Sequence, residues 1–252
     1  MTVGLYTSEP DSPRGYFPVE EETLAKTRGE ISAPDPKEAF SSGPPEAPAG
    51  HTHTDDFDFF YGANLWPVAL PDFETAWLAY YRAMELLGAK IMTLLAAALG
   101  LDDDFFAPYH THHISALRAI NYPAMPAVAG SSRAGAHSDY GSVTILKPDP
   151  HVGGLEVMAP DGDWIHVPSV IDAFVVNVGD LLAHWTNNRW VSTLHRVVAP
   201  DENPVPRRQS IAYFMNPNYD AAIRVIQPGD DAATGAAITA GQYLVDKFRS
   251  AF

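Results

Sequence analysis

The chain has 252 residues, 46% of them hydrophobic, which suffices for one sizeable core and is compatible with a single domain over residues 1–252. Acidic residues outnumber basic ones by 31 to 16, and the net charge of −15 repels nucleic-acid phosphate and anionic lipid, so we expect neither partner. Cysteine is absent, which excludes disulfides, thiolate metal sites and cysteine nucleophiles. The sequence has no uninterrupted apolar run of about 18 residues, so we predict no membrane span.

The first part of the chain, residues 1–56, is rich in proline, glycine, serine and charged residues, and we predict an irregular segment here. Residues 15–18 and Phe40 are candidate anchors that hold this segment against the body. Its first residues lack a charged region followed by an apolar one, which argues against a secretory signal. Together with the absence of cysteine, this favours a cytoplasmic location.

A long amphipathic helix is the clearest feature of residues 57–114, which we interpret as helical support for the core. Asp72 is a candidate N-cap, and Gly100 is a candidate stop signal. Between them, large apolar residues recur at helical spacing: Phe73, Trp77, Tyr80, Met84, Leu87, Ile91 and Leu95. The run Asp102 to Asp104 favours the start of a second short helix, because the glycine and distal glutamate of a calcium loop do not follow it.

Short β-rich runs separated by glycine, proline and aspartate characterise residues 115–228, which we predict to form the core. The predicted strands are Leu117–Tyr122, Ser142–Lys147, Leu155–Met158, Trp164–Val167, Phe174–Val178, Leu181–Trp185, His195–Val198 and Ser210–Met215. A C-terminal helix is expected within residues 229–252, beginning at Thr239, where Gln242 completes a capping box. This order predicts a mainly β fold with flanking helices, a double-stranded β-helix (jelly roll, or cupin-like barrel).

The pair His137 and Asp139 is the centre of the functional prediction. On extended backbone, residues two apart project to the same face, so one imidazole and one carboxylate reach the same point. His195, in a later predicted strand, is the best candidate for a third ligand. Two histidines and one carboxylate form the facial triad of non-haem Fe(II) oxygenases, which leaves three positions open for a bidentate keto acid and dioxygen. Taken alone, the pair is also a common chance occurrence in a chain with ten histidines.

Arg208 and Ser210 form a second constellation at the start of an apolar strand. They point to one face of that strand, and a guanidinium with a hydroxyl would clamp the distal carboxylate of a dicarboxylic keto acid. Arg207 must then face the other way. For Arg208 alone, a surface charge is the simpler interpretation.

Several stretches of the chain resemble the isopenicillin N synthase-like family of Fe(II)/2-oxoglutarate dioxygenases. The matching stretches are residues 117–123, 137–146, 152–157, 177–182, the segment around His195, and residues 208–217. The resemblance extends from about Gly15 to Phe252. It implies that iron is ligated by His137, Asp139 and His195. It also implies that 2-oxoglutarate is bound by Arg208 and Ser210.

The resemblance carries further expectations about cosubstrate and chemistry. Tyr122 matches a tyrosine that in several members touches the cosubstrate or the substrate, although a core aromatic is an equal alternative. The implied reaction consumes 2-oxoglutarate and O2, releases succinate and CO2, and hydroxylates or desaturates a small organic molecule of secondary or amino-acid metabolism. Family members usually carry an additional N-terminal part before the region that matches Gly15, and this part is missing here. A natural start at Met1 would leave one flank of the barrel uncovered and open to a partner chain, so the oligomeric state stays open.

Two alternatives to this function stay open. An Fe(II) oxidase or cyclase that needs no 2-oxoglutarate, of isopenicillin N synthase type, would share the triad and the Arg-x-Ser pair. A catalytically degenerate barrel that acts as a binding module would work without metal, and the intact triad disfavours it. The histidine-rich stretch 109–113 suggests a metal site, but we expect loop or edge-strand residues there.

Overall fold

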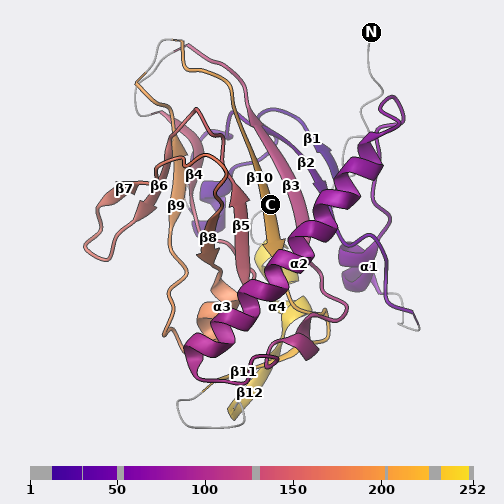
Figure 1. Cartoon of the computed structure of the whole chain (residues 1–252). Helices are drawn as coiled ribbons and strands as arrows, with labels where there is room; N and C mark the ends of the chain where they lie inside the picture. The colour runs from indigo at the N-terminus through magenta and orange to yellow at the C-terminus, as the bar shows by residue number, and fades with distance from the viewer. Residues whose placement is uncertain are drawn as a thin grey trace.

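Two antiparallel sheets form the body of the protein in a computed structural model that describes residues 13–29, 31–49, 54–126, 131–201, 204–226 and 234–249 (Figure 1). The larger sheet has, in spatial order, β1 (Gly15–Phe17), β2 (Glu38–Ser42), β3 (Ala116–Tyr122), β10 (Arg208–Met215), β5 (Val143–Lys147) and β8 (Val175–Val178). The smaller sheet has β4 (Ser132–His137), β9 (His195–Val198), β6 (Leu155–Met158) and β7 (Trp164–His166). A separate hairpin pairs β11 (Ala222–Val225) with β12 (Thr234–Thr239).

The inner faces of the two sheets pack against each other. Tyr122 on the larger sheet belongs to one buried cluster with Ala134, Leu155 and Val197, which all lie on the smaller sheet. Because successive strand residues face opposite sides, the alternate positions of β10 point away from this interior, toward the helical layer. This arrangement of two facing sheets with flanking helices confirms the predicted double-stranded β-helix.

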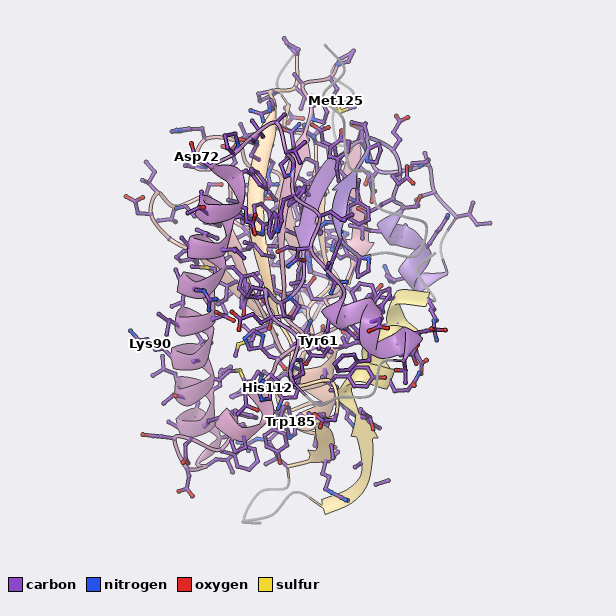
Figure 2. The ribbon with its side chains drawn as sticks, turned by 90° about the vertical axis from the view of Figure 1, so that its right-hand side faces the viewer. Tyr61, Asp72, Lys90, His112, Met125 and Trp185 are labelled. Carbon is purple, nitrogen blue, oxygen red and sulfur yellow. The ribbon has the colours of Figure 1, made fainter. Side chains whose placement is uncertain are left out.

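Helix α2 (Phe73–Leu99) covers the outer face of the larger sheet. Figure 2 shows it running alongside the strands, from the end near Asp72 past Lys90. The helix approaches β10 so closely that a Cβ on Gly88 would lie 2.7 Å from the sulfur of Met215. It ends at Gly100, whose φ of 75° suits glycine, so the predicted helix and its stop signal are confirmed.

The remaining helices are short. They are η1 (Leu24–Arg28), α1 (Asp55–Tyr61), η2 (Ala107–His110), α3 (Asp180–Trp185) and α4 (Ala240–Arg249). Helices α1 and α4 contribute Phe60 and Leu244 to one apolar cluster that also holds Ile114. The second helix predicted from Asp102 is a series of turns leading into η2. Within the described residues, no helix combines the length and apolar character that crossing a membrane requires.

Further sequence predictions differ from the structure. Residues 181–185 form helix α3 rather than the predicted strand, because a fully buried apolar run has no periodicity that separates a strand from a helix. The segment predicted to be irregular, residues 1–56, contributes β1, η1 and β2. The C-terminal region predicted as a helix alone, residues 229–252, also contains β12, and its residues up to 233 lie outside the described part.

A buried charge network anchors the N-terminal segment to the larger sheet. The Glu22 carboxylate accepts a hydrogen bond of 2.6 Å from Lys37 Nζ and another from Arg118 on β3. The Lys37 side chain is only 3% exposed, and Asp35 lies 3.8 Å from its ammonium group. Since a buried charge is stable only when it is paired, this network explains why a segment without regular sequence patterning is ordered.

We predict that Glu22→Gln destabilises the protein by about 3 kcal/mol, because it leaves Lys37 buried without its main counter-charge. Burial raises the pKa of Glu22, but Arg118 and Lys37 outweigh this and hold it at about 2, below the ordinary value of 4.5. The carboxylate therefore contributes its stability above pH 4.5 and loses it as the pH falls toward 2.

Urea unfolding at several pH values measures both effects. The exposed neighbour Glu21 provides the control, since Glu21→Gln should change stability by less than about 0.5 kcal/mol. Equal stability of the two variants would show that the network does not anchor the segment.

Candidate metal centre

The fold brings together the three residues predicted as metal ligands. His137 ends β4 and lies opposite His195, the first residue of β9, in the antiparallel register, and their ring centroids are 4.3 Å apart. Asp139 follows two residues after His137, and its Oδ1 lies 3.7 Å from Nε2 of His195. The potential ligand atoms all lie within 4.8 Å of one another, and no other such group of three occurs in the described part of the chain.

Both imidazoles are held by their second nitrogen. The Nδ1 atom of His137 is 2.7 Å from the carbonyl oxygen of Gly135, and that of His195 is 3.1 Å from the carbonyl oxygen of Thr193. A ring that donates its Nδ1 proton to a carbonyl leaves Nε2 as the lone-pair donor. The two rings are thus oriented to offer Nε2 to a shared cation.

The charge state of the three residues also suits a metal. Burial raises the pKa of Asp139, but the nearby imidazoles of His195 and His137 and a 2.7 Å hydrogen bond from Asn177 Nδ2 outweigh burial and lower it. Burial, together with the neighbouring His195, lowers the pKa of His137 from its ordinary 6.5 to about 4. Near neutral pH the site therefore offers an anionic carboxylate and a neutral imidazole from His137, as ligands of a divalent cation require.

The turn that carries Asp139 is fixed by the start of α3. The backbone N–H of Asp180 donates to the carbonyl oxygen of Asp139 at 2.7 Å, and that of Leu181 donates to the carbonyl oxygen of Tyr140 at 3.1 Å. Gly179 permits this close approach, since a Cβ there would lie 2.3 Å from the carbonyl oxygen of Gly141. The segment for which we had predicted a strand is thus part of the support of the site.

Arg208, Ser210 and Tyr122 lie together on the inner face of the larger sheet. Arg208 is 2% exposed, and its Nη1 donates to the Ser210 hydroxyl at 3.3 Å. Tyr122 is its cross-strand neighbour, with the ring centroid 5.1 Å from the guanidinium carbon. Arg207 is exposed on the opposite face, as the alternation predicted.

The Arg208 guanidinium is buried and incompletely hydrogen-bonded. Its Nε is buried without a hydrogen-bond acceptor, and no carboxylate in the described residues forms a salt bridge with it. A buried, incompletely bonded guanidinium is costly unless an anion binds it. The pair of Arg208 and Ser210 therefore fits a carboxylate ligand such as the distal group of 2-oxoglutarate.

One supporting residue, Asn177, was not identified from the sequence. It lies on β8, and a single asparagine in an apolar strand carries no spacing signal of its own. The histidine-rich stretch 109–113, by contrast, has local partners: His110 contacts the carbonyl oxygen of Phe106, and His113 Nε2 lies 3.0 Å from a Glu85 carboxylate oxygen. The candidate metal group of the described residues, His137, Asp139 and His195, does not include this stretch.

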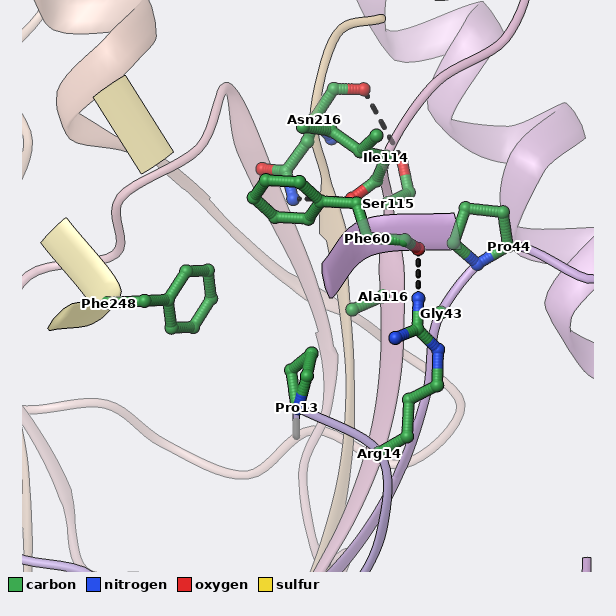
Figure 3. A pocket seen from close by; sticks show the side chains of 10 residues that line it. All are labelled: Pro13, Arg14, Gly43, Pro44, Phe60, Ile114, Ser115, Ala116, Asn216 and Phe248. Atoms are coloured by element: carbon green, nitrogen blue, oxygen red, sulfur yellow. Dashed lines mark hydrogen bonds between the residues drawn. The ribbon is translucent and has the colours of Figure 1, made fainter. Parts of the chain in front are cut away.

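A small cavity of about 30 Å³ lies elsewhere in the fold, between the N-terminal segment, α1 and α4 (Figure 3). Arg14 lines it and donates to the carbonyl oxygens of Phe59 and Phe60, while Arg14 Nε and Asn216 Oδ1 are buried without a partner. Its size suits about one water molecule. None of the three candidate metal ligands lines it.

Comparisons with known proteins agree with this geometry. A family model described as the 2OG-Fe(II) oxygenase superfamily matches residues 112–217. Validamycin A dioxygenase from Streptomyces hygroscopicus subsp. limoneus is 34% identical over 242 residues, which cover 93% of this chain and 64% of that protein. A 2-oxoglutarate-dependent dioxygenase from Didymella fabae is 36% identical over 234 residues, which cover 87% of this chain and 69% of that protein. The chain thus spans less than two thirds of the length of the first relative.

A solved structure extends the likeness to the whole described fold. Neurospora crassa T7H, in complex with alpha-KG and thymine, superimposes with a TM-score of 0.81 at 32% sequence identity. The superposition covers 98% of this chain and 77% of that chain. The shared fold therefore includes the N-terminal strands as well as the barrel.

We predict that Asn177→Leu weakens binding of a divalent metal by about 10- to 100-fold, because the Asp139 carboxylate loses the hydrogen bond that orients it. Titration of the metal-free protein with Mn(II), followed by electron paramagnetic resonance, measures this affinity. Val176, the exposed neighbour on the same strand, supplies the control variant Val176→Ala. Unchanged Mn(II) affinity in Asn177→Leu would show that Asp139 needs no support from β8.

Proposed function

Because the chain belongs to the 2OG-Fe(II) oxygenase superfamily, we propose that it is a dioxygenase that uses Fe(II) and 2-oxoglutarate to oxidise a small organic molecule. The predicted family resemblance is thereby confirmed. The observation that carries the proposal is the convergence of His137, Asp139 and His195 within 4.8 Å. Hydroxylation with release of succinate and CO2 is the reaction we assign.

The three convergent residues would hold iron from one side. His137 and His195 present Nε2, and Asp139 supplies the negative charge. When bound, iron with 2-oxoglutarate and O2 supplies the oxidising chemistry for a C–H bond. The protein contributes the fixed geometry of its ligands, with Asn177 orienting the carboxylate and the start of α3 fixing the turn.

Arg208 and Ser210 would bind the distal carboxylate of 2-oxoglutarate. The two donors lie on the inner face of β10, and the unpartnered Nε of Arg208 adds a further donor. Tyr122 lies opposite Arg208 on β3 and would form a wall of the same subsite. Burial of all three side chains excludes water from this end of the site, which strengthens a charge-assisted hydrogen bond.

The three convergent ligands disfavour one of the two alternatives, because a metal-free binding module would leave them unexplained. The Arg-x-Ser pair does not separate the other alternative, because an oxidase that needs no 2-oxoglutarate shares it; the names of the relatives favour the dioxygenase. The relatives are named as dioxygenases, and T7H binds alpha-KG and thymine, which supports a small-molecule substrate for this chain. Hydroxylation or desaturation as the outcome, and the cytoplasmic location, stay predictions from the sequence.

We predict that the protein develops a visible charge-transfer band when Fe(II) and 2-oxoglutarate are added without oxygen, and that His137→Ala lacks it. With O2 admitted, a screen of small organic molecules read out as succinate should show turnover in the unaltered protein and none in His137→Ala. Succinate formation at the unaltered rate in His137→Ala would refute the assignment.

We predict that Arg208→Met raises the KM for 2-oxoglutarate by about 100-fold, because a buried charge-assisted pair is lost. Arg207→Met is the matched control, since the neighbouring side chain is exposed and its Nε donates to Asn121 Oδ1. Steady-state kinetics at varied 2-oxoglutarate concentration separate this effect from a loss of folded protein, which would lower kcat alone.

A further inference from the structure

A second arginine is buried beside the candidate cosubstrate site and has no assigned role. Arg133 lies on β4, four residues before His137, and is 0% exposed. Its guanidinium carbon is 5.4 Å from the ring centroid of Tyr122, and that of Arg208 is 5.1 Å from the same ring. Two guanidinium groups, one from each sheet, therefore flank one tyrosine.

No carboxylate neutralises this pair of cations. Within the described residues, neither Arg133 nor Arg208 forms a salt bridge, and the Nε atom of each is buried without an acceptor. Burial lowers the pKa of Arg133, and the charge of Arg208 lowers it further. Burial raises the pKa of Asp149, but hydrogen bonds from the backbone N–H groups of residues 209, 151 and 152, with a smaller contribution from the charge of Arg208, lower it. Since buried like charges repel, an anion is needed to stabilise them.

Arg133 also fixes the backbone on both sides of Arg208 and Tyr122. Its Nη2 donates to the carbonyl oxygens of Tyr122 at 2.9 Å and Pro123 at 2.8 Å, at the end of β3. Its Nη1 donates to the carbonyl oxygen of Pro206 at 3.1 Å, two residues before Arg208. One side chain on the smaller sheet thus joins the two strands of the larger sheet that carry the candidate carboxylate-binding residues.

We propose that Arg133 is a positioning residue of the cosubstrate subsite, which sets Arg208 and Tyr122 in place and adds a second positive charge that selects keto acids with a distal carboxylate. This inference rests on the proposed function and deepens it. Arg133 does not need to touch the cosubstrate, because its two terminal nitrogens are committed to carbonyl oxygens. Its charge acts through the low-dielectric interior, where screening by water is weak.

The test compares two keto acids that share the metal-chelating end. 2-Oxoglutarate carries the distal carboxylate, whereas 2-oxovalerate has a methyl group in its place. Their dissociation constants are measured from the charge-transfer band of the Fe(II)-loaded protein without oxygen. We expect Arg133→Met to raise the dissociation constant of 2-oxoglutarate by about tenfold or more. The dissociation constant of 2-oxovalerate should change by less than about twofold. Arg133→Lys, which keeps the charge, should recover part of the preference for 2-oxoglutarate.

The controls separate this inference from its premise and from simple unfolding. Arg207→Met removes an exposed charge next to Arg208 and should leave both constants unchanged. Thermal unfolding in the absence of ligand shows whether each variant folds. If Arg133→Met does not fold, Arg133→Lys is used in its place. If a folded variant bound both keto acids equally more weakly, or bound both as tightly as the unaltered protein, the proposed role of Arg133 would be overturned. Absence of any 2-oxoglutarate binding by the unaltered protein would instead refute the proposed function.

Discussion

The antiparallel pairing of β4 with β9 places His137 directly opposite His195, and the rest of the site is arranged around this pair. Side chains on paired strands share a face only in one register, and a slip of one residue would turn one imidazole out of the barrel. The pairing is irregular between Ala134 and His137, so the last residue of β4 is set by a local bulge rather than by the ladder alone. Asp139 then needs only the turn held by α3 to reach the same point.

The interior between the two sheets has an apolar part and a polar part. The apolar part contains Ala134, Leu155 and Val197. The polar part contains Arg208 and Ser210, at the start of β10. Because β9 and β10 are consecutive strands, the strand that carries the candidate ligand His195 is followed by the strand that carries Arg208 and Ser210. Two chemically different subsites thus depend on one pair of consecutive strands.

Much of this could be predicted from the sequence, and the failures have physical causes. The pair of His137 and Asp139 was identified because its spacing on extended backbone is a local property. Strands β3, β5, β8 and β10 were predicted because runs of β-branched and aromatic residues are a local signal too, whereas β11 and β12 were not predicted. Strand β4, with the sequence Ser-Arg-Ala-Gly-Ala-His, was missed because small residues carry little strand preference. The order of the N-terminal segment depends on Glu22 bonding to Arg118 across 96 positions, for which no local pattern exists. Asn177 and Arg133 were missed because their importance comes only from what the fold places beside them.

Asp180 links the candidate metal centre to the far end of the chain. Its backbone N–H holds the carbonyl oxygen of Asp139, and its carboxylate accepts a 2.9 Å hydrogen bond from Lys247 on α4. The same helix places Phe248 against Tyr140, with ring centroids 5.5 Å apart. The C-terminal helix therefore supports the turn that carries Asp139 and Tyr140. A substitution in α4 can thus shift the turn that carries Asp139 without altering any of the three candidate metal ligands.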